Sequence, residues 1–462
     1  MKRFTIYFHY DGQGILDTPC RLAAQAFRQV SQGMLLVSNG VLATESRSWV
    51  NQAGIPVLER LNSGLDVGAY RQALQTVGRE VLAGFDELVL VNYTLAGPLG
   101  NLEDLFARMD ARTELDFWGL TRHYPMKSRR FGGQVPEHLQ SHFLAVRGRM
   151  LHSDVFWSYW QNMKEPATYE QSVMLHETRF TSEFAALGYC WDTAVDTQDL
   201  REVFVNPIMA CPAELLRRGC PFFKRRSFFT DFEEELRRTD GTAARELYDY
   251  LKENTGYPVD ALVQSLLRTQ PLHALAQNLH WNTVLPRESG PLEGLSVVRL
   301  PIDCEVQPLR WYLEQRAVWA QEQLSRAATL FARDPLLGAA APALPLLPRT
   351  ERWAARQWKA AQPLLKSAGL TVPWEDTVPP PAAGAGWFLV RDCAFPQGVP
   401  QNSWLLPLAA QQNGYTTVTF MPESAAAAQG DLLAVYARAA NRPAAVAKQL
   451  ARLARDAGKR KA

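Results

Sequence analysis

The first hundred residues alternate short apolar runs with polar loops that contain glycine. The apolar runs predict strands at residues 4–8, 34–37, 57–58 and 88–91. Apolar residues at helical spacing between these runs predict helices over residues 19–30, 44–52 and 69–82. A strand, a helix and a second strand in succession form a βαβ unit with parallel strands. The amino-terminal part is therefore predicted to be an α/β sheet flanked by helices.

Small polar residues follow each of these predicted strands. Asp11 and Asn39 follow the first two strands, Asn62 and Asp66 follow the third, and Asn92 follows the fourth. In open α/β sheets, ligands bind where the carboxyl ends of the strands meet the loops. We expect Asn39 and Asn62 to contact a nucleotide base, and Asp66 to accept a hydrogen bond from a ribose or sugar hydroxyl. The same residue types also stabilise turns without any ligand.

The loop over residues 62–68 contains two glycines. Gly64 and Gly68 allow the backbone to approach a ligand closely. Their spacing is not G-x-G-x-x-G, and no lysine follows as in a P-loop, so neither phosphate-cradle motif explains the loop.

Five further polar or aromatic residues are candidates for the site. Asp116 and Trp118 are expected to line a ligand pocket, where a tryptophan would stack on a ligand, although a core position suits Trp118 equally. His138 and Gln140 begin a strand that then becomes apolar, so we expect them to point into the cleft. Glu177 starts a helix, where a glutamate serves as a base or only complements the helix dipole.

The composition divides the chain into three parts. An α/β domain over residues 1–232 and a helical linker over 233–290 are followed by a smaller domain, 291–462, in which alanine, proline and leucine dominate. The sequence LFAR at 105–108 recurs at 330–333, and FLAVR at 143–147 resembles WFLVR at 387–391. The smaller domain is interpreted as a degenerate repeat of one half of the first domain.

Charge and cysteine usage exclude several classes of protein. A net charge of +2 gives no broad field for nucleic acid. The six cysteines show no C-x-x-C pair and no zinc spacing, which favours reduced thiols in a cytoplasmic protein. No apolar run approaches the ~20 residues that a membrane helix needs. We expect any membrane contact to be peripheral.

Several short motifs together resemble a known family. In chain order they are VSNG (37–40), NSGLDVGAY (62–70), VN (91–92) with GPL (97–99), DFWG (116–119), HLQSHF (138–143), HE (176–177) with LGY (187–189), and NP (206–207) with PFFK (221–224). Over residues 1–285 the chain resembles the rhamnan synthesis protein F family of glycosyltransferases.

The resemblance implies a GT-A-like fold that transfers a sugar, typically rhamnose, from a nucleotide diphosphate donor to a growing cell-surface glycan. It implies an acceptor attached to a lipid carrier, a peripheral membrane position and other polysaccharide-assembly proteins as partners. It further implies that Asp116 and Trp118 line the donor or acceptor pocket, with Trp118 stacked on a sugar, and that His138 contacts the pyrophosphate. Tyr70 is added to the expected donor-binding residues.

Tyr93 departs from the family pattern. The family has an Asn-Asp pair after the buried strand, near the metal-binding carboxylate of GT-A enzymes, and here the second residue is Tyr93. A phenol is a poor ligand for Mg²⁺ or Mn²⁺, which prefer carboxylate oxygens. Three alternatives follow: Asp66 or Asp116 holds the metal, His and Arg side chains meet the diphosphate charge, or this member is catalytically weakened. The metal ligands stay unknown at this point.

The sequence therefore predicts an inverting glycosyltransferase, with Glu177 and Asp116 as its catalytic carboxylates and Glu177 as the base that takes the acceptor proton. The first alternative is a non-catalytic glycan-binding or assembly subunit, which Tyr93 favours. A nucleotidyltransferase is the second alternative, and the missing lysine-bearing glycine loop disfavours it.

Overall fold

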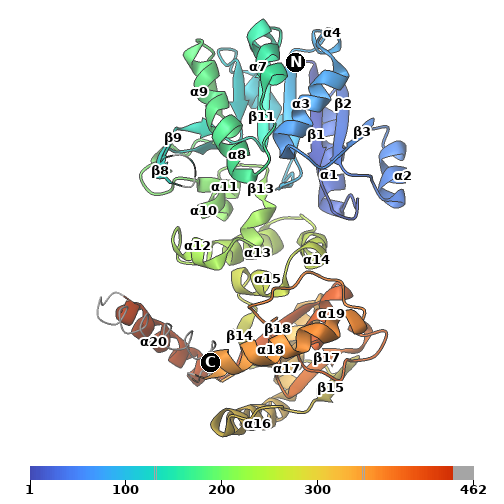
Figure 1. Cartoon of the computed structure of the whole chain (residues 1–462), viewed down its shortest axis with the longest axis vertical. Helices are drawn as coiled ribbons and strands as arrows, with labels where there is room; N and C mark the ends of the chain where they lie inside the picture. Colours follow the sequence, from blue (N-terminus) through green and yellow to red (C-terminus); the bar gives the residue numbers. More distant parts are fainter. Residues whose placement is uncertain (130, 132, 346, 348, 441–462) are drawn as a thin grey trace, which may run out of the picture. The chain divides into compact units, whose positions relative to one another are not determined.

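The computed structural model describes residues 1–129, 131, 133–345, 347 and 349–440. The chain divides into two compact units, residues 1–265 (unit 1) and residues from 266 onward (unit 2) (Figure 1). The predicted division at residues 232 and 290 stays a prediction. The segment predicted as a linker holds α12 (Phe232–Leu236), α13 (Ala243–Asn254), α14 (Val259–Thr269), α15 (Leu272–Asn278) and β14 (Asn282–Val284).

One mixed sheet organises unit 1. Within the described residues seven strands lie in the order β12-β6-β11-β4-β1-β2-β3. Their bounds are β1 (Arg3–His9), β2 (Gly33–Asn39), β3 (Val57–Arg60), β4 (Glu87–Asn92), β6 (Phe117–Gly119), β11 (Phe143–Arg147) and β12 (Trp191–Thr193). Strands β1 to β4 are parallel, and β11 runs antiparallel to both β4 and β6. The predicted α/β fold with a helix-flanked sheet is confirmed.

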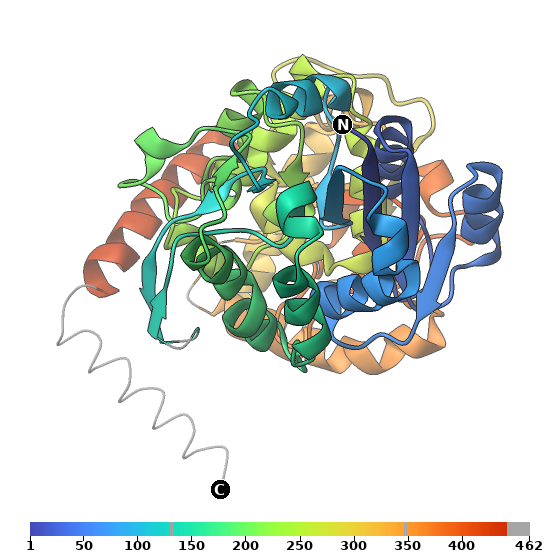
Figure 2. The same ribbon diagram turned by 90° about the horizontal axis from the view of Figure 1, so that it is seen from above.

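Both faces of this sheet carry apolar side chains and are buried. On β4, Val89 and Val91 face one apolar cluster, whereas Leu88 and Leu90 face another. Successive strand residues point to opposite faces, so an uninterrupted apolar run requires a cover on each side. The helices supply two layers on opposite sides of the sheet (Figure 2).

The first layer packs against the Val89 face and consists of α1 (Thr18–Val30), α2 (Thr44–Gln52), α5 (Leu102–Asp110), α10 (Pro207–Ala210) and α11 (Pro212–Arg217). The second layer packs against the Leu88 face and consists of α3 (Leu65–Val77), α4 (Arg79–Leu82), α6 (Gly148–Leu151), α7 (Asp154–Asn162) and α9 (Thr178–Ala186).

Three predicted elements are interrupted in the structure. The helix predicted over 69–82 breaks at Gly78, whose φ of 82° lies in the left-handed region. The strand predicted from residue 138 divides into β10 (His138–Leu139), which pairs with β7 (Arg122–His123), and β11. The helix predicted to start at Glu177 instead begins with α8 (Tyr169–Ser172) and is interrupted by a π-helical turn, Val173–Glu177, before α9.

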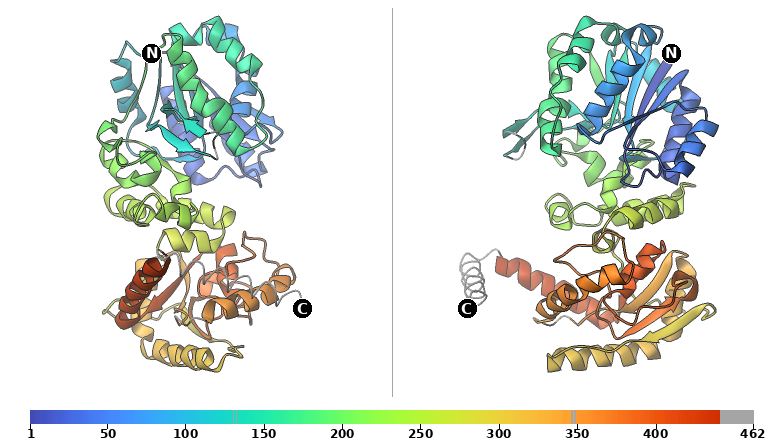
Figure 3. Two further views of the ribbon diagram at one scale, coloured as in Figure 1. Left: turned by 60° about the vertical axis from the view of Figure 1, so that its left-hand side comes forward. Right: turned by 45° about the vertical axis from the view of Figure 1, so that its right-hand side comes forward.

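Unit 2 holds a second sheet, with helices packed around it (Figure 3). In its described residues five strands lie in the order β14-β18-β16-β17-β15, in which β16 is parallel to β18 and antiparallel to β17. The strands other than β14 are β15 (Leu295–Arg299), β16 (Leu337–Pro342), β17 (Trp387–Arg391) and β18 (Thr416–Met421). The helices other than α14 and α15 are α16 (Gln307–Glu322), α17 (Leu324–Arg333), α18 (Thr350–Ser367), α19 (Leu406–Gln412) and α20 (Glu423–Ala440).

Part of unit 2 shares its topology with part of unit 1. The order α17, β16, β17, α19, β18 matches α5, β6, β11, α9, β12, and each set joins one parallel and one antiparallel neighbour to its first strand. The last residue of each antiparallel strand donates a hydrogen bond to a carbonyl near the end of the helix that opens its set: Arg147 to Met109 of α5 and Arg391 to Phe331 of α17. The predicted repeat stays a prediction, which this likeness supports.

Within the part of the chain that the structure describes, no helix is both long enough and apolar enough to cross a membrane.

Candidate functional site

The candidate site lies where parallel strands of unit 1 end. His9 ends β1, Asn39 ends β2 and Asn92 ends β4, and the strands are in register so that Phe8 pairs with Asn92. Because β11 runs in the opposite direction, the turn that precedes it, with Ser141, lies at this same edge. The fold therefore brings the ends of β1, β2 and β4 to the beginning of β11.

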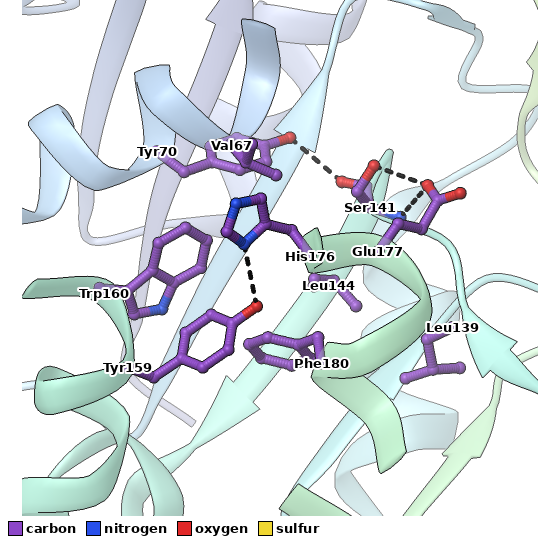
Figure 4. A pocket seen from close by; sticks show the side chains of 10 residues that line it. All are labelled: Val67, Tyr70, Leu139, Ser141, Leu144, Tyr159, Trp160, His176, Glu177 and Phe180. Carbon is purple, nitrogen blue, oxygen red and sulfur yellow. Dashed lines mark hydrogen bonds between the residues drawn. The ribbon is translucent and has the colours of Figure 1, made fainter. Parts of the chain in front are cut away.

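Two carboxylates meet at this edge through one serine. Ser141 Oγ lies 2.7 Å from Glu177 Oε2 and 3.0 Å from Asp66 Oδ2, and the Ser141 amide donates to Glu177 Oε2 at 2.9 Å. Asn92 Nδ2 donates to Asp66 Oδ2 at 3.1 Å. Figure 4 shows the Ser141–Glu177 pair beside the helical turn that carries Glu177. The structure thus joins Asn92, Asp66, Ser141 and Glu177 in one hydrogen-bonded chain.

The two carboxylates of this hydrogen-bonded network differ in how readily they bind a proton. A serine hydroxyl has one hydrogen, so it cannot donate to both carboxylates at once. Burial and the charge of Glu177 raise the pKa of Asp66. Burial opposes ionisation of Glu177, but the neighbouring His138, Lys224 and Ser141 outweigh it and hold the pKa of Glu177 well below its usual value. Glu177 is therefore the ionised partner, and Asp66 is the one that retains a proton more readily.

A π-helical turn presents Glu177. Residues Val173–Glu177 adopt this wider turn, and π-turns inside α-helices are frequent at functional sites. His176 in the same turn is buried, and its Nε2 lies 2.8 Å from the Lys164 carbonyl. A small pocket lined in part by His176 and Glu177 has a volume of about 10 Å³, which is room for about one water molecule (Figure 4). This pocket is therefore too small for a ligand larger than water.

The glycine loop is held in an unusual backbone conformation. Gly64 and Leu65 have φ values of 63° and 55°, and a left-handed Leu costs energy that the surrounding structure must offset. Asn39 is buried, and its Nδ2 lies 3.2 Å from Asn62 Oδ1 and 3.4 Å from the Leu65 carbonyl. Arg60 donates to Asn39 Oδ1 at 2.6 Å. Asn39 therefore positions the loop, and base contacts by Asn39 and Asn62 stay predictions.

Three other predicted residues lie around the carboxylate chain. Tyr70 is buried on α3, and its hydroxyl donates to the Ser141 carbonyl at 3.3 Å. His138 is buried, and its Nε2 lies 3.7 Å from Glu177 Oε1, beyond hydrogen-bond distance. Gln140 is also buried and accepts from Thr121 Oγ1 at 3.3 Å. Gly68, in the first turn of α3, donates its amide to the Gly64 carbonyl at 2.7 Å.

The structure does not bring Asp116 and Trp118 to this edge. Asp116 lies just before β6, at the end of the sheet where β11 finishes, and it binds the Arg149 guanidinium at 2.5 and 2.6 Å. Trp118 is fully buried, and its Nε1 donates to Glu87 Oε2 at 2.9 Å. Strand β6 runs parallel to β4, so its beginning lies opposite the carboxyl edge. Asp116 is therefore separated from Asp66 and Glu177, which lie at the carboxyl edge.

Sequence reasoning did not select Ser141, Lys224 or His9 as site residues. Ser141 and Lys224 stand inside the HLQSHF and PFFK motifs, and His9 directly precedes the polar turn after β1. A polar residue inside each motif was the available signal. Their convergence depends on contacts between distant segments, and Ser141 is 75 positions from Asp66.

The residues at this edge fit a divalent cation poorly. Among the described residues, no group of three or more His, Cys, Asp and Glu side chains is arranged to hold a metal. Asp66 Oδ2 already lies within hydrogen-bond distance of Asn92 Nδ2 and Ser141 Oγ, and Glu177 Oε2 lies within that distance of the Ser141 amide and hydroxyl. Tyr93 packs edge-on against Phe8 and His9, and burial raises the pKa of its phenol strongly.

His9 gives a testable dependence of stability on pH. Its ring is buried, and burial lowers the pKa of His9 from 6.5 to about 4. In the unfolded chain His9 binds a proton near pH 6.5, whereas the folded chain resists protonation until about pH 4, so stability falls as the pH falls through this window. We expect His9 to contribute roughly 3 kcal/mol to this loss. The pH dependence of chemical denaturation should be shallower in His9→Gln and unchanged in a control at exposed His152, His152→Gln.

Comparison with known proteins identifies a family for most of the described part of unit 1. A family model described as rhamnan synthesis protein F matches residues 34–293, which is more than half of the chain. The resemblance drawn from the motifs is confirmed. No curated protein matches the chain.

Several solved structures show a distant likeness. A cytidylyltransferase from Leptospira borgpetersenii is 11% identical over 41% of this chain and 74% of its own, with a TM-score of 0.25. A glucosyl-3-phosphoglycerate synthase from Mycobacterium tuberculosis, solved with Mn²⁺, uridine-diphosphate-glucose and phosphoglyceric acid, is 9% identical over 32% of this chain and 58% of its own, with a TM-score of 0.22. A 4-diphosphocytidyl-2C-methyl-D-erythritol synthase from Anaerococcus prevotii is 6% identical over 42% and 86%, with a TM-score of 0.28. At these scores the likeness carries no argument about the chemistry of this chain.

Proposed function

The chain belongs to the rhamnan synthesis protein F family, and from this premise we propose that it is a glycosyltransferase that moves a sugar from a nucleotide diphosphate donor to a growing cell-surface polysaccharide. Rhamnose is the proposed sugar and deoxythymidine-diphosphate rhamnose the proposed donor, because the family is described by rhamnan synthesis. The observation that carries the proposal is the Ser141-bridged pair of Asp66 and Glu177 at the carboxyl edge of the sheet.

Glu177 is the proposed base. Its Oε2 is held by Ser141, whereas Oε1 lies 3.7 Å from His138 Nε2 and is the oxygen proposed to take the acceptor proton. In transfer, the acceptor oxygen bonds to the anomeric carbon as the bond from that carbon to the diphosphate oxygen breaks. The bonding electron pair leaves with the diphosphate, and the acceptor proton passes to Glu177 Oε1. Attack opposite the leaving group inverts the anomeric centre.

Asp66 and Asn92 orient the base and the donor in this proposal. Asp66 is bonded to both Asn92 and Ser141, so it fixes the hydroxyl that in turn fixes Glu177. The glycine loop around Gly64 lies at the start of the same helix and is the proposed donor-contacting segment. The proposed acceptor is a lipid-linked glycan, which entails a peripheral contact with the membrane and with other assembly proteins.

A ligand screen tests this function directly. We expect deoxythymidine or uridine diphosphates and their sugars to raise the melting temperature of the full chain, because a ligand that binds only the folded state stabilises it. The stabilisation is about 2.7 kcal/mol at a hundredfold excess over the dissociation constant. The same sugars without a nucleotide serve as controls. Absence of any shift with every nucleotide sugar would contradict the proposal.

Tyr93 favours a second candidate, a non-catalytic glycan-binding subunit. This residue occupies the acidic position of the family pattern and packs against Phe8 and His9 instead of facing a ligand. Hydrolysis of the sugar donor distinguishes an enzyme from a binding subunit. An enzyme should release free sugar slowly from its donor, and that release should be lost in Glu177→Gln, whereas a binding subunit should bind glycan and leave every donor intact.

A further inference from the structure

The proposed function requires a group that stabilises the negative charge of the leaving diphosphate. The inference that follows rests on that function. The diphosphate gains negative charge as it leaves, and enzymes stabilise such charge with metal ions, lysines or arginines already in place. Three carboxylates at this edge have protein partners within hydrogen-bond distance: Asp66 has Asn92 and Ser141, Glu177 has Ser141, and Asp17 has Arg225. The carboxylate oxygens needed to hold a divalent cation are therefore largely engaged.

Lys224 is a cation that the backbone places beside these groups. It ends the short strand β13 (Phe223–Lys224), which pairs antiparallel with β5 (Leu95–Ala96) so that Lys224 lies opposite Leu95. The next residue, Arg225, donates its amide to the Thr94 carbonyl at 2.9 Å. The Thr94 amide in turn donates to Asn92 Oδ1 at 3.1 Å. Lys224 is thus anchored to the segment that directly follows β4.

The Lys224 ammonium group lies near two carboxylates but is not paired with either of them. Within the described part of the chain, its ammonium group has no ion pair within 4.0 Å and no hydrogen bond, although the residue is half-buried. Burial lowers the pKa of Lys224 to about 8, while the charges of Glu177 and Asp66 raise it, so the ammonium stays largely protonated at neutral pH. A half-buried ammonium that lacks a bonded partner favours an anionic ligand.

His142 adds a second polar group near Lys224. Its ring is buried, and its Nδ1 has no hydrogen-bond partner among the described residues. Burial, and then the charge of Lys224, lower the pKa of His142 well below its usual value, so the ring stays neutral. A neutral imidazole can donate to a phosphate oxygen or accept from the Lys224 ammonium without adding charge.

From this geometry we infer that Lys224 is the residue that meets the charge of the leaving diphosphate, and that donor binding by this chain does not depend on a divalent cation. Lys224 binds a diphosphate oxygen as a point charge, as lysine does in other phosphate sites. Tyr93 is compatible with this arrangement, because no carboxylate is then required at its position. Glu177 keeps its separate role toward the acceptor.

Calorimetry on the full chain tests the inference with deoxythymidine diphosphate and uridine diphosphate as probes, each with EDTA and with Mn²⁺. We expect the dissociation constant of the bound diphosphate to change less than about twofold between the two conditions. Lys224→Met should weaken it about 10- to 100-fold, as expected for the loss of one charge-assisted contact. Lys224→Arg should retain most of the affinity, and Lys359→Met, at an exposed lysine of α18, should match the unchanged chain.

The matched nucleoside separates loss of charge from loss of structure. Deoxythymidine and uridine lack phosphate, so their affinity should be the same in Lys224→Met as in the unchanged chain, and equal weakening of nucleoside and diphosphate would overturn the charge role. Binding that requires Mn²⁺ and is insensitive to Lys224→Met would overturn the inference and leave the proposed function standing. Failure of both diphosphates to bind under every condition would remove the proposed function and this inference together.

Discussion

Glu177→Gln is expected to lower the rate of sugar transfer by about 10²- to 10⁴-fold. Glutamine keeps the size and one carbonyl oxygen of the side chain, so the hydrogen bonds from Ser141 are retained in part. It cannot accept a proton, and the acceptor hydroxyl then loses its base. Because glutamine removes a proton acceptor and little volume, the loss should appear mainly in kcat. Initial rates of nucleotide diphosphate release, with donor and acceptor both varied, measure it.

A control on the same helix separates this effect from general disturbance. Glu183 lies on α9 and is exposed, so Glu183→Gln makes the same chemical change away from Ser141. We expect its kcat to stay within about twofold of the unchanged chain and the Glu177→Gln variant to keep its affinity for the donor. Full activity in Glu177→Gln would remove this residue as the base and leave Asp66 as the carboxylate to test.

Glu87→Gln is expected to destabilise the protein by about 3–5 kcal/mol. Glu87 has no exposed surface, and its carboxylate accepts from Arg3 Nε at 2.8 Å, Arg147 Nε at 2.9 Å and Trp118 Nε1 at 2.9 Å. Glutamine would leave two buried guanidinium groups without their shared counter-charge, and its amide NH₂ would face other donors. Denaturation by urea, followed by tryptophan fluorescence, should show the transition at a lower urea concentration.

An exposed ion pair in the same unit provides the comparison. Arg21 Nη2 lies 2.7 Å from Glu45 Oε1, and the Glu45 side chain is 83% exposed. Because water and salt screen such a pair, Glu45→Gln should cost about 0–1 kcal/mol. If both substitutions lower the free energy of unfolding by the same amount, burial does not strengthen the interactions of Glu87. Glu87 and its three partners lie at the end of the sheet opposite Glu177. Under conditions in which the variant is fully folded, Glu87→Gln should therefore bind the donor with unchanged affinity.

Local pattern determined the general architecture of unit 1. Apolar runs such as 88–91 have the length and composition of strands that are covered on both faces, and the structure buries all of β4. The polar residues after such runs predicted an edge where Asp66 and Asn92 meet, because parallel strands end at the same side of a sheet. The direct hydrogen bond between these two side chains agrees with that expectation.

Tertiary structure alone decided which polar residues share the site. Asp116 and Asp66 are equally polar and equally placed beside strands in the sequence, but β6 carries Asp116 to the opposite end of the sheet, where Arg149 binds it. Ser141 joins Asp66 to Glu177 across separations of 75 and 36 positions, and the β5–β13 pair brings Lys224 to the same edge. Periodicity describes neighbours within one strand or helix, whereas strand order, chain direction and long-range pairing bring these residues together, which is why only the folded chain assigns them.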